Sequence, residues 1–275
     1  MNRSRRPGAV ALKAWTVLVI VVLYLPMAAM VLMSFNESRY GVMPFHFSTK
    51  WYRTLGPDNP LVTSTLLSLQ LALYVTATCA VIGTALGLWL SSTRLVRLRL
   101  VTNAALMATV TVPILILSVG ILTVVQAIGL GQSAVSLWLA CTVVSLPYMT
   151  FVVVARLGSI DAALVPASRS LGFGAFGTFR RVTLPLLRTA MAAGSLMAFV
   201  TCFNNFTVQL FLAPVGVQTL PVNIYAQTRV GVTPDINAIA SIIIVATVLL
   251  VLALQLLSGS TARLITGQER DITDG

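Results

Sequence analysis

The sequence is dominated by uninterrupted apolar segments that are long enough to cross a lipid bilayer. Residues 14–34 and 238–257 contain no charged side chain. About 20 apolar residues in a helix cross the ~30 Å hydrocarbon core of a membrane. A soluble domain carries about 25% charged residues, whereas this chain has 9%. The expected fold class is therefore an all-α, polytopic membrane protein.

Six segments predict transmembrane helices, and we expect them to form a single transmembrane domain over residues 1–275. The predicted spans are residues 14–34, 64–90, 101–127, 133–155, 189–213 and 237–258. Pro26, Pro113 and Pro147 lie inside spans, where neighbouring helices can satisfy the freed backbone groups. The first span is longer than a signal-peptide core, so we interpret it as a retained signal anchor.

The basic residues are distributed unevenly between the two sides of these spans. Fourteen of the 18 basic residues fall on one side: Arg3, Arg5, Arg6, Lys13, Arg94, Arg97, Arg99, Arg156, Arg169, Arg180, Arg181, Arg188, Arg263 and Arg270. Cytoplasmic loops of membrane proteins carry an excess of Lys and Arg. Both termini and the segment 156–188 are therefore predicted to be cytoplasmic. The net charge of +11 indicates orientation rather than nucleic-acid binding.

The residue types needed for catalysis are scarce. The chain has one histidine, no paired carboxylates near the spans and no G-x-x-x-x-G-K-[ST] phosphate loop. We therefore expect that the chain is not an enzyme by itself and has no catalytic residue, metal or cofactor of its own. Cys79, Cys141 and Cys202 lie in apolar spans at unpaired spacings, which is typical of small core residues.

The six spans also contain no ionisable side chain at depth. Ion-coupled transporters usually carry such a group for proton or ion relay. An ion-coupled secondary transporter or a channel is therefore the less favoured alternative, and we expect the energy for transport to come from a partner protein.

The segment 156–188 predicts two short helices between the fourth and fifth spans. Asp161 is placed to cap the first helix, and Pro166 suits a first helical turn. Gly172 is expected to end that helix with a positive φ. The second helix is expected from about Ala175 to Val182, ending ahead of the following Leu-Pro pair. Such a pair of helices is suited to docking into another protein, and the alternative is a merely solvated loop.

The residues "DAALVPASRSLGFGAFGTFRRVTLPL" resemble the EAA loop of ABC-importer permeases. Gly172, Val182, Leu184 and Pro185 stand at the matching positions of that pattern. The candidate coupling-loop residues are Asp161, Pro166, Ala167, Ser168, Gly172, Val182, Leu184 and Pro185. The resemblance implies that this loop is a coupling helix that docks into an ATPase subunit. Two positions depart from the pattern, because Pro166 replaces the Glu and Ser168 replaces the second Ala.

Two further stretches extend the resemblance over nearly the whole chain. "YLPMAAMVLMSFNESRYG" followed by "FSTKWY", and "LPVNIYAQTRVGVTPDINAIASI", resemble the second permease subunit of the spermidine/putrescine permease family. The resemblance implies a six-helix importer subunit of the bacterial cytoplasmic (inner) membrane that works by alternating access. It also implies three kinds of partner: a homologous permease, two ATPase subunits that use ATP and magnesium, and a periplasmic or lipid-anchored solute-binding protein.

The same resemblance points to residues on the solute pathway. In the relatives, acidic residues on the pathway face are linked to cation recognition, whereas here three carboxylates are missing. The candidate pathway residues are Trp51, Ile114, Cys202, Asn204 and Asn205. The missing charges make spermidine a less favoured solute. We expect a small solute of the polyamine and organic-amine class, and the alternative is an amino-acid-like, opine or phosphonate-type solute. Because neighbours on a helix point about 100° apart, at most one of the two mid-span asparagines is expected to face the pathway.

Overall fold

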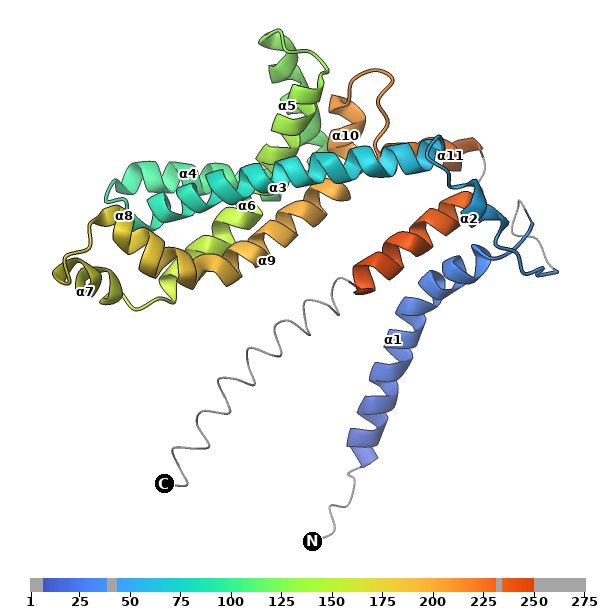
Figure 1. Cartoon of the computed structure of the whole chain (residues 1–275), viewed down its shortest axis with the longest axis horizontal. Helices are drawn as coiled ribbons and strands as arrows, with labels where there is room; N and C mark the ends of the chain where they lie inside the picture. Colours follow the sequence, from blue (N-terminus) through green and yellow to red (C-terminus); the bar gives the residue numbers. More distant parts are fainter. Residues whose placement is uncertain (1–6, 39–43, 231–233, 250–275) are drawn as a thin grey trace. The chain divides into compact units, whose positions relative to one another are not determined.

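The computed structural model describes residues 7–38, 44–230 and 234–249, and these ranges are helical without a β-strand. The chain separates into two compact units (Figure 1). The first combines Met1–Val62 with Ala226–Gly275, and the second is Thr63–Tyr225. Each unit is described by itself.

The first unit contains α1 (Pro7–Met33), the short α2 (Lys50–Thr54) and an apolar helix over Pro234–Leu249. An antiparallel bridge joins Asn36 to Phe47 between α1 and α2. The chain between α1 and α2 is therefore held by backbone pairing within a loop and not by packing between helices.

Aromatic side chains fix α2 to the chain that follows α1. The Trp51 ring N–H donates to the Asn36 carbonyl at 2.8 Å, and the hydroxyls of Tyr52 and Ser34 lie 2.7 Å apart. Phe35 stacks on the ring of Phe47 and packs at a tilt against the ring of Tyr52. These contacts explain how a helix of only five residues keeps its place.

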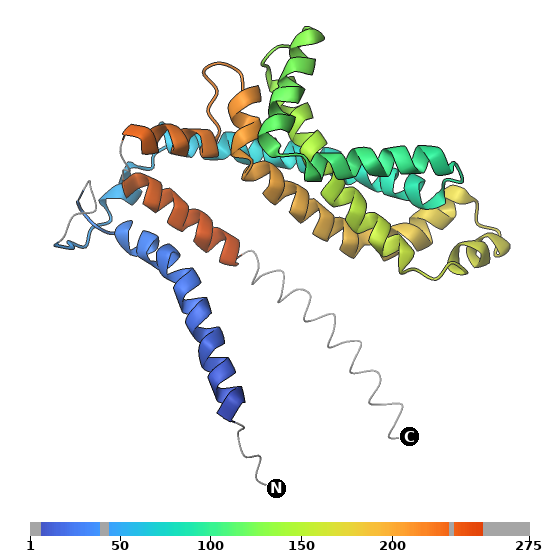
Figure 2. The ribbon, with the colours of Figure 1, turned by 180° about the vertical axis from the view of Figure 1, so that it is seen from behind.

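The second unit is a bundle of long helices with several short ones. Its helices are α4 (Val96–Thr111), α5 (Ile114–Ala127), α6 (Ala134–Gly158), α7 (Leu164–Ser170), α8 (Ala175–Thr178), the π-helical turn η1 (Phe179–Thr183), α9 (Leu184–Phe203), α10 (Phe206–Leu212) and most of α3 (Pro60–Ser92). Helix α11 (Leu220–Val230) begins in this unit and ends in the first. Helix α6 packs along α9, and α4 packs on α6. Helices α5 and α10 contact each other and stand off the long helices (Figure 2).

Close packing in this bundle depends on glycines that face Met149 of α6. A Cβ on Gly83 of α3 would lie 2.7 Å from the Met149 Cγ, and one on Gly194 of α9 would lie 2.5 Å from the Met149 Sδ. Because the hydrophobic effect does not drive helices together inside a bilayer, such small residues let helix backbones approach and gain dispersion contacts. Met149 is fully buried and holds α3, α6 and α9 together.

Four helices in the described residues are long and apolar enough to cross a membrane. They are Leu12–Met33, Pro60–Ser92, Ala134–Gly158 and Ala175–Phe203. Their positions confirm helices at the predicted first, second and fourth spans and over the first part of the fifth. The predicted sixth span, 237–258, is helical over Pro234–Leu249 and otherwise lies outside the described residues. The count of six spans therefore stays a prediction.

The prediction of one continuous helix over residues 101–127 is wrong. Helices α4 and α5 are bent by 117° relative to each other at Val112 and Pro113 (Figure 1). Proline disfavours the α conformation of the residue before it and lacks the N–H that the helix would need. Val112 is accordingly extended, with ψ 134°. If the bent pair is one broken span, the described residues contain five candidate spans.

Candidate functional site

The loop between α6 and α9 folds as two short helices joined at a glycine. The Asp161 carboxylate accepts the Ala163 N–H at 2.9 Å, one residue before α7 begins. Pro166 lies in the first turn of α7, and Gly172 follows the end of the helix with φ +86°. The predicted helix stop at Gly172 and its positive φ are confirmed.

One side-chain contact joins α7 to α8, and a second joins the turn between them to η1. The hydroxyls of Ser168 and Thr178 lie 3.1 Å apart and both side chains are buried. The guanidinium of Arg181 lies 4.8 Å from the centre of the Phe173 ring. The Ser168 hydroxyl, which is a departure from the EAA pattern, therefore has a local structural role.

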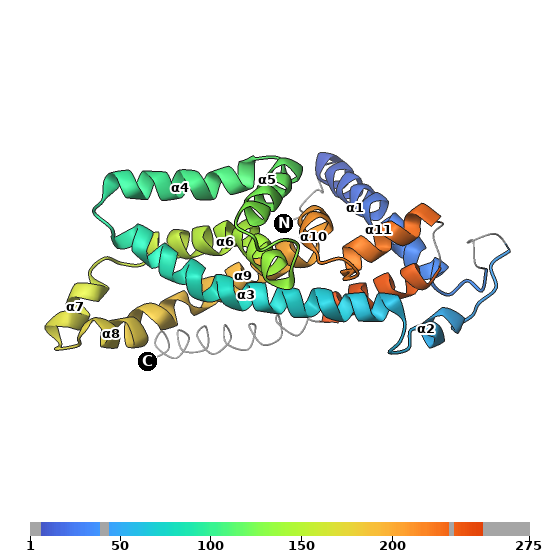
Figure 3. The same cartoon turned by 90° about the horizontal axis from the view of Figure 1, so that it is seen from above.

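Two large apolar side chains of the same loop are exposed. Leu171 is 77% exposed and Phe176 is 75% exposed. The loop lies at one end of the second unit, beyond the ends of the long helices (Figure 3). A clasped pair of helices that presents large apolar side chains is suited to inserting into a groove of another protein.

The remaining predicted loop residues lie where the loop meets α6 and α9. Ala167 is exposed on α7, whereas the half-buried Val182 borders a cavity of about 160 Å³. That cavity is lined by Leu157, Ile160, Asp161, Ala162, Leu164, Val165, Val182, Thr183 and Leu186. Leu184 and Pro185 are the first two residues of α9.

The prediction that the second loop helix ends ahead of Leu184 and Pro185 is wrong. The chain passes from α8 through the π-helical turn η1 directly into α9. At this turn the Leu184 N–H donates to the Phe179 carbonyl, five residues back. Pro185 has no N–H, and its ring would clash with the carbonyl four residues earlier. The wider π turn accommodates the proline without ending the helix.

The two asparagines predicted to lie mid-span lie instead at a break in the helix. Helix α9 ends at Phe203 and α10 begins at Phe206. The Asn205 side chain accepts the Val208 N–H at 3.0 Å and caps α10. Asparagine competes with helical hydrogen bonds in this way and favours caps over helix interiors. The prediction of a continuous helix over 189–213, and the 100° argument built on it, are wrong.

A buried glutamine links the two halves of this broken helix. Gln209 of α10 is fully buried, and its Nε2 donates to the Cys202 carbonyl at 2.6 Å, in the last turn of α9. Its Oε1 is also buried and has no hydrogen-bond partner among the described residues. The adjacent asparagines were a signal for the break, but no sequence signal placed Gln209 beside the Cys202 carbonyl.

The other candidate pathway residues are spread over both units. Cys202, like Cys79 and Cys141, is a free and buried cysteine, which confirms the interpretation of all three as core residues. Ile114 is the first residue of α5, which packs against α10. Trp51 belongs to the first unit, where its ring N–H is held by Asn36.

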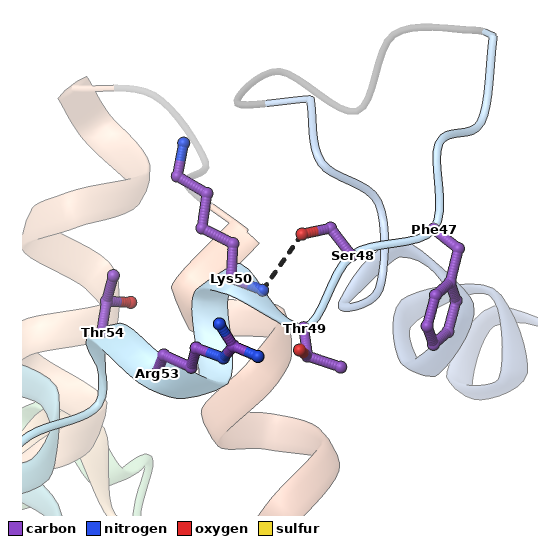
Figure 4. Close-up of a pocket in the computed structure, with 6 residues that line it drawn as sticks. All are labelled: Phe47, Ser48, Thr49, Lys50, Arg53 and Thr54. Carbon is purple, nitrogen blue, oxygen red and sulfur yellow. Dashed lines mark hydrogen bonds between the residues drawn. The ribbon is translucent and has the colours of Figure 1, made fainter.

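A shallow pocket of about 480 Å³ beside α2 is lined by Phe47, Ser48, Thr49, Lys50, Arg53 and Thr54. Figure 4 shows the Lys50 and Arg53 side chains extending in different directions. The Ser48 hydroxyl accepts the Lys50 N–H at 3.2 Å, which is a local turn contact. The two cations do not converge on one point, so this pocket is not assigned a binding role.

Comparison with known proteins identifies the chain's relatives. The family described as binding-protein-dependent transport system inner membrane component matches residues 83–265. The spermidine/putrescine transport system permease protein PotC of Haemophilus influenzae is 29% identical over 245 residues, covering 89% of this chain and 95% of PotC. The putrescine transport system permease protein PotI of Escherichia coli is 30% identical over 244 residues, covering 84% of this chain and 85% of PotI.

A solved structure has the same fold. It is a bacterial ABC transporter involved in the import of the acidic polysaccharide alginate; the matched chain has a TM-score of 0.68 and 13% identity, with 94% of this chain and 98% of that chain covered. The likeness shows that the fold of this chain is also found in an ABC importer. On the extent of these matches, the chain belongs to the family of binding-protein-dependent transport system inner membrane components and is a multi-pass permease subunit of an ABC importer.

Proposed function

We propose that the chain imports a small solute of the polyamine and organic-amine class by alternating access. Its partners would be a homologous permease, two ATPase subunits and a periplasmic or lipid-anchored solute-binding protein. ATP and magnesium would be bound by the ATPase subunits, since this chain has no phosphate-binding loop. The names of PotC and PotI, which specify spermidine and putrescine, support the solute class.

The observation that supports the coupling role is the exposure of Leu171 and Phe176 at the tip of the 156–188 loop. Leu171 and Phe176 project from α7 and α8, while Ser168 and Thr178 hold the helices together from the inside. A preformed projection loses little conformational entropy on docking. We infer that this tip inserts into a groove of an ATPase subunit and transmits its movement through η1 to α9.

The proposed topology has six spans in a single transmembrane domain, with both termini and the 156–188 loop in the cytoplasm. Its support is the distribution of basic residues, fourteen of which fall on one side of the predicted spans. The location would be the bacterial cytoplasmic membrane.

The proposed solute pathway includes Trp51, Ile114, Cys202, Asn204 and Asn205. No Asp or Glu occurs between Asp161 and Asp235, so the broken fifth span offers amides and backbone carbonyls instead of carboxylates. An amide both donates and accepts hydrogen bonds. This composition suits a solute with few positive charges better than a polycation.

The test is transport by the complete importer, with its own binding protein, in proteoliposomes. We expect ATP-dependent uptake of putrescine or a related amine, and none when the ATPase subunits are omitted. Uptake without ATPase subunits would instead support an ion-coupled transporter. Uptake of an amino acid, an opine or a phosphonate, with no amine carried, would refute the solute class and leave the importer role standing.

A further inference from the structure

The break between α9 and α10 gathers hydrogen-bond acceptors in a region with no formal charge. Helix α9 has 20 residues, and the carbonyl end of a helix carries a partial charge of roughly −0.5. Residues 189–228 contain no Asp, Glu, Lys, Arg or His. In membrane proteins, the carbonyl ends of broken helices and their unwound backbone are used to coordinate cations.

An independent observation at the same place is the unpaired oxygen of Gln209. The side chain is fully buried, and within the described part of the chain no donor lies within hydrogen-bond distance of Oε1. Its Nε2 is held 2.6 Å from the Cys202 carbonyl, in the last turn of α9. Covalent geometry places the two amide atoms about 2.3 Å apart, so Oε1 also lies close to the carbonyl end of α9.

The orientation of this amide is determined by its surroundings. If the amide were flipped, its oxygen would face the Cys202 carbonyl oxygen at the same short distance, and the two acceptors would repel. A buried polar atom without a partner costs about 1–3 kcal/mol, and such atoms in native proteins call for a specific explanation. The Cys202 carbonyl and the Asn205 side-chain oxygen already accept hydrogen bonds, so Gln209 Oε1 is the acceptor at this break that lacks a donor among the described residues.

We propose that Gln209 Oε1 and the carbonyl end of α9 bind one ammonium group of the solute. The inference rests on the proposed function and deepens it, because it names the group that is recognised and the atom that receives it. An N–H of the ammonium donates to Oε1, and the partial negative charge of the helix end stabilises the positive charge. The site offers one neutral acceptor oxygen and the partial negative charge of one helix end. These can stabilise a single ammonium group, so the second amine of a diamine must be recognised elsewhere.

Two substitutions separate this role from a purely structural one. Gln209→Met and Gln209→Glu both remove the Nε2 donor to Cys202, but only the glutamate keeps an acceptor oxygen. Gln126→Met is the matched control, since Gln126 is an exposed glutamine on α5. In the complete importer, with assembly checked for each variant, the KM for putrescine should rise about tenfold or more for Gln209→Met. It should rise less for Gln209→Glu, because the carboxylate keeps an acceptor for the ammonium although one of its oxygens now faces the Cys202 carbonyl. It should stay within about threefold of wild type for Gln126→Met.

Equal changes in Gln209→Met and Gln209→Glu would show that Gln209 only braces the broken helix, and the inference would be wrong. An unchanged KM in Gln209→Met would overturn it as well. If the wild-type importer carries neither putrescine nor another amine, the result refutes the proposed solute class and not the role of Gln209 alone.

A binding measurement on the wild-type complex tests the same inference without any variant and without a transport assay. Methylammonium has N–H donors and tetramethylammonium has none, although both carry one positive charge. We expect methylammonium chloride, but not tetramethylammonium chloride, to raise the apparent unfolding midpoint of the detergent-solubilised complex. Equal effects of the two salts would contradict hydrogen bonding to Oε1.

Discussion

The packing of Gly194 against Met149 allows a quantitative test of the helix bundle. Replacing Gly194 with Ala adds a Cβ that would lie 2.5 Å from the Met149 Sδ and 3.2 Å from the Met149 Cα. The sulfur belongs to a flexible side chain, but the Cα is backbone of α6 and cannot turn away. Met149 also has little room to move toward α3, because an added Cβ on Gly83 would already lie 2.7 Å from its Cγ.

The expected cost follows from these two contacts. Overpacking a close-packed core costs about 1–3 kcal/mol, whereas Gly→Ala in a helix interior gains up to about 1 kcal/mol. The net destabilisation of Gly194→Ala should therefore be about 1–2 kcal/mol. Gly120→Ala is the matched control, since Gly120 lies within α5 with nothing within 4 Å of an added Cβ. It should be neutral or slightly stabilising.

The three buried cysteines provide the assay. Cys79, Cys141 and Cys202 are free and buried, so a thiol-reactive fluorescent dye labels them only when the bundle opens. Heating the detergent-solubilised protein with the dye then gives an apparent unfolding midpoint. For a protein of this size, 1–2 kcal/mol corresponds to a decrease of about 2–8 °C.

A second variant tests the cause of the decrease. Met149→Ala alone should destabilise by about 2–5 kcal/mol because it leaves a cavity. In the Gly194→Ala, Met149→Ala double variant the new methyl enters that cavity, so the combined loss should be smaller than the sum of the two single losses. Equal midpoints for Gly194→Ala and Gly120→Ala, or additive losses in the double variant, would refute the packing argument.

Three further predictions concern the loop, the topology and the broken span. Gly172→Val forces a β-branched residue to φ +86°, at about 1–2 kcal/mol or more, and should uncouple ATP hydrolysis from transport; normal solute-stimulated ATPase activity would contradict the coupling role. A cysteine placed at Ser48 should react with an impermeant reagent from outside intact cells, and labelling only after permeabilisation would reverse the proposed orientation. Asn205→Ala removes the α10 cap and should lower stability by about 1 kcal/mol, whereas Asn204→Ala should reduce transport without that loss; wild-type transport in both assembled variants would exclude them from the pathway.

Hydropathy and charge in the sequence were enough to predict a helical membrane protein and the places of most spans. The reason is physical: a backbone in hydrocarbon must satisfy its own hydrogen bonds, so an apolar segment of about 20 residues has essentially one structure available. Local chemistry also predicted the turn at Gly172, because a positive φ strongly favours glycine. The motif of the 156–188 loop was enough to indicate the family.

The sequence did not decide where those apolar segments break. Pro113 and Pro147 both interrupt apolar runs, yet only Pro113 ends its helix, whereas Pro147 is buried within a continuous α6. Pro185 likewise starts α9 through a π turn instead of separating it from the loop. Whether a proline or an asparagine stops a membrane helix depends on which neighbours satisfy the released backbone groups, and those neighbours are set by tertiary packing. The same dependence brings Gln209 to the Cys202 carbonyl across the break at Asn204 and Asn205, a contact that exists only once α10 has turned away from α9.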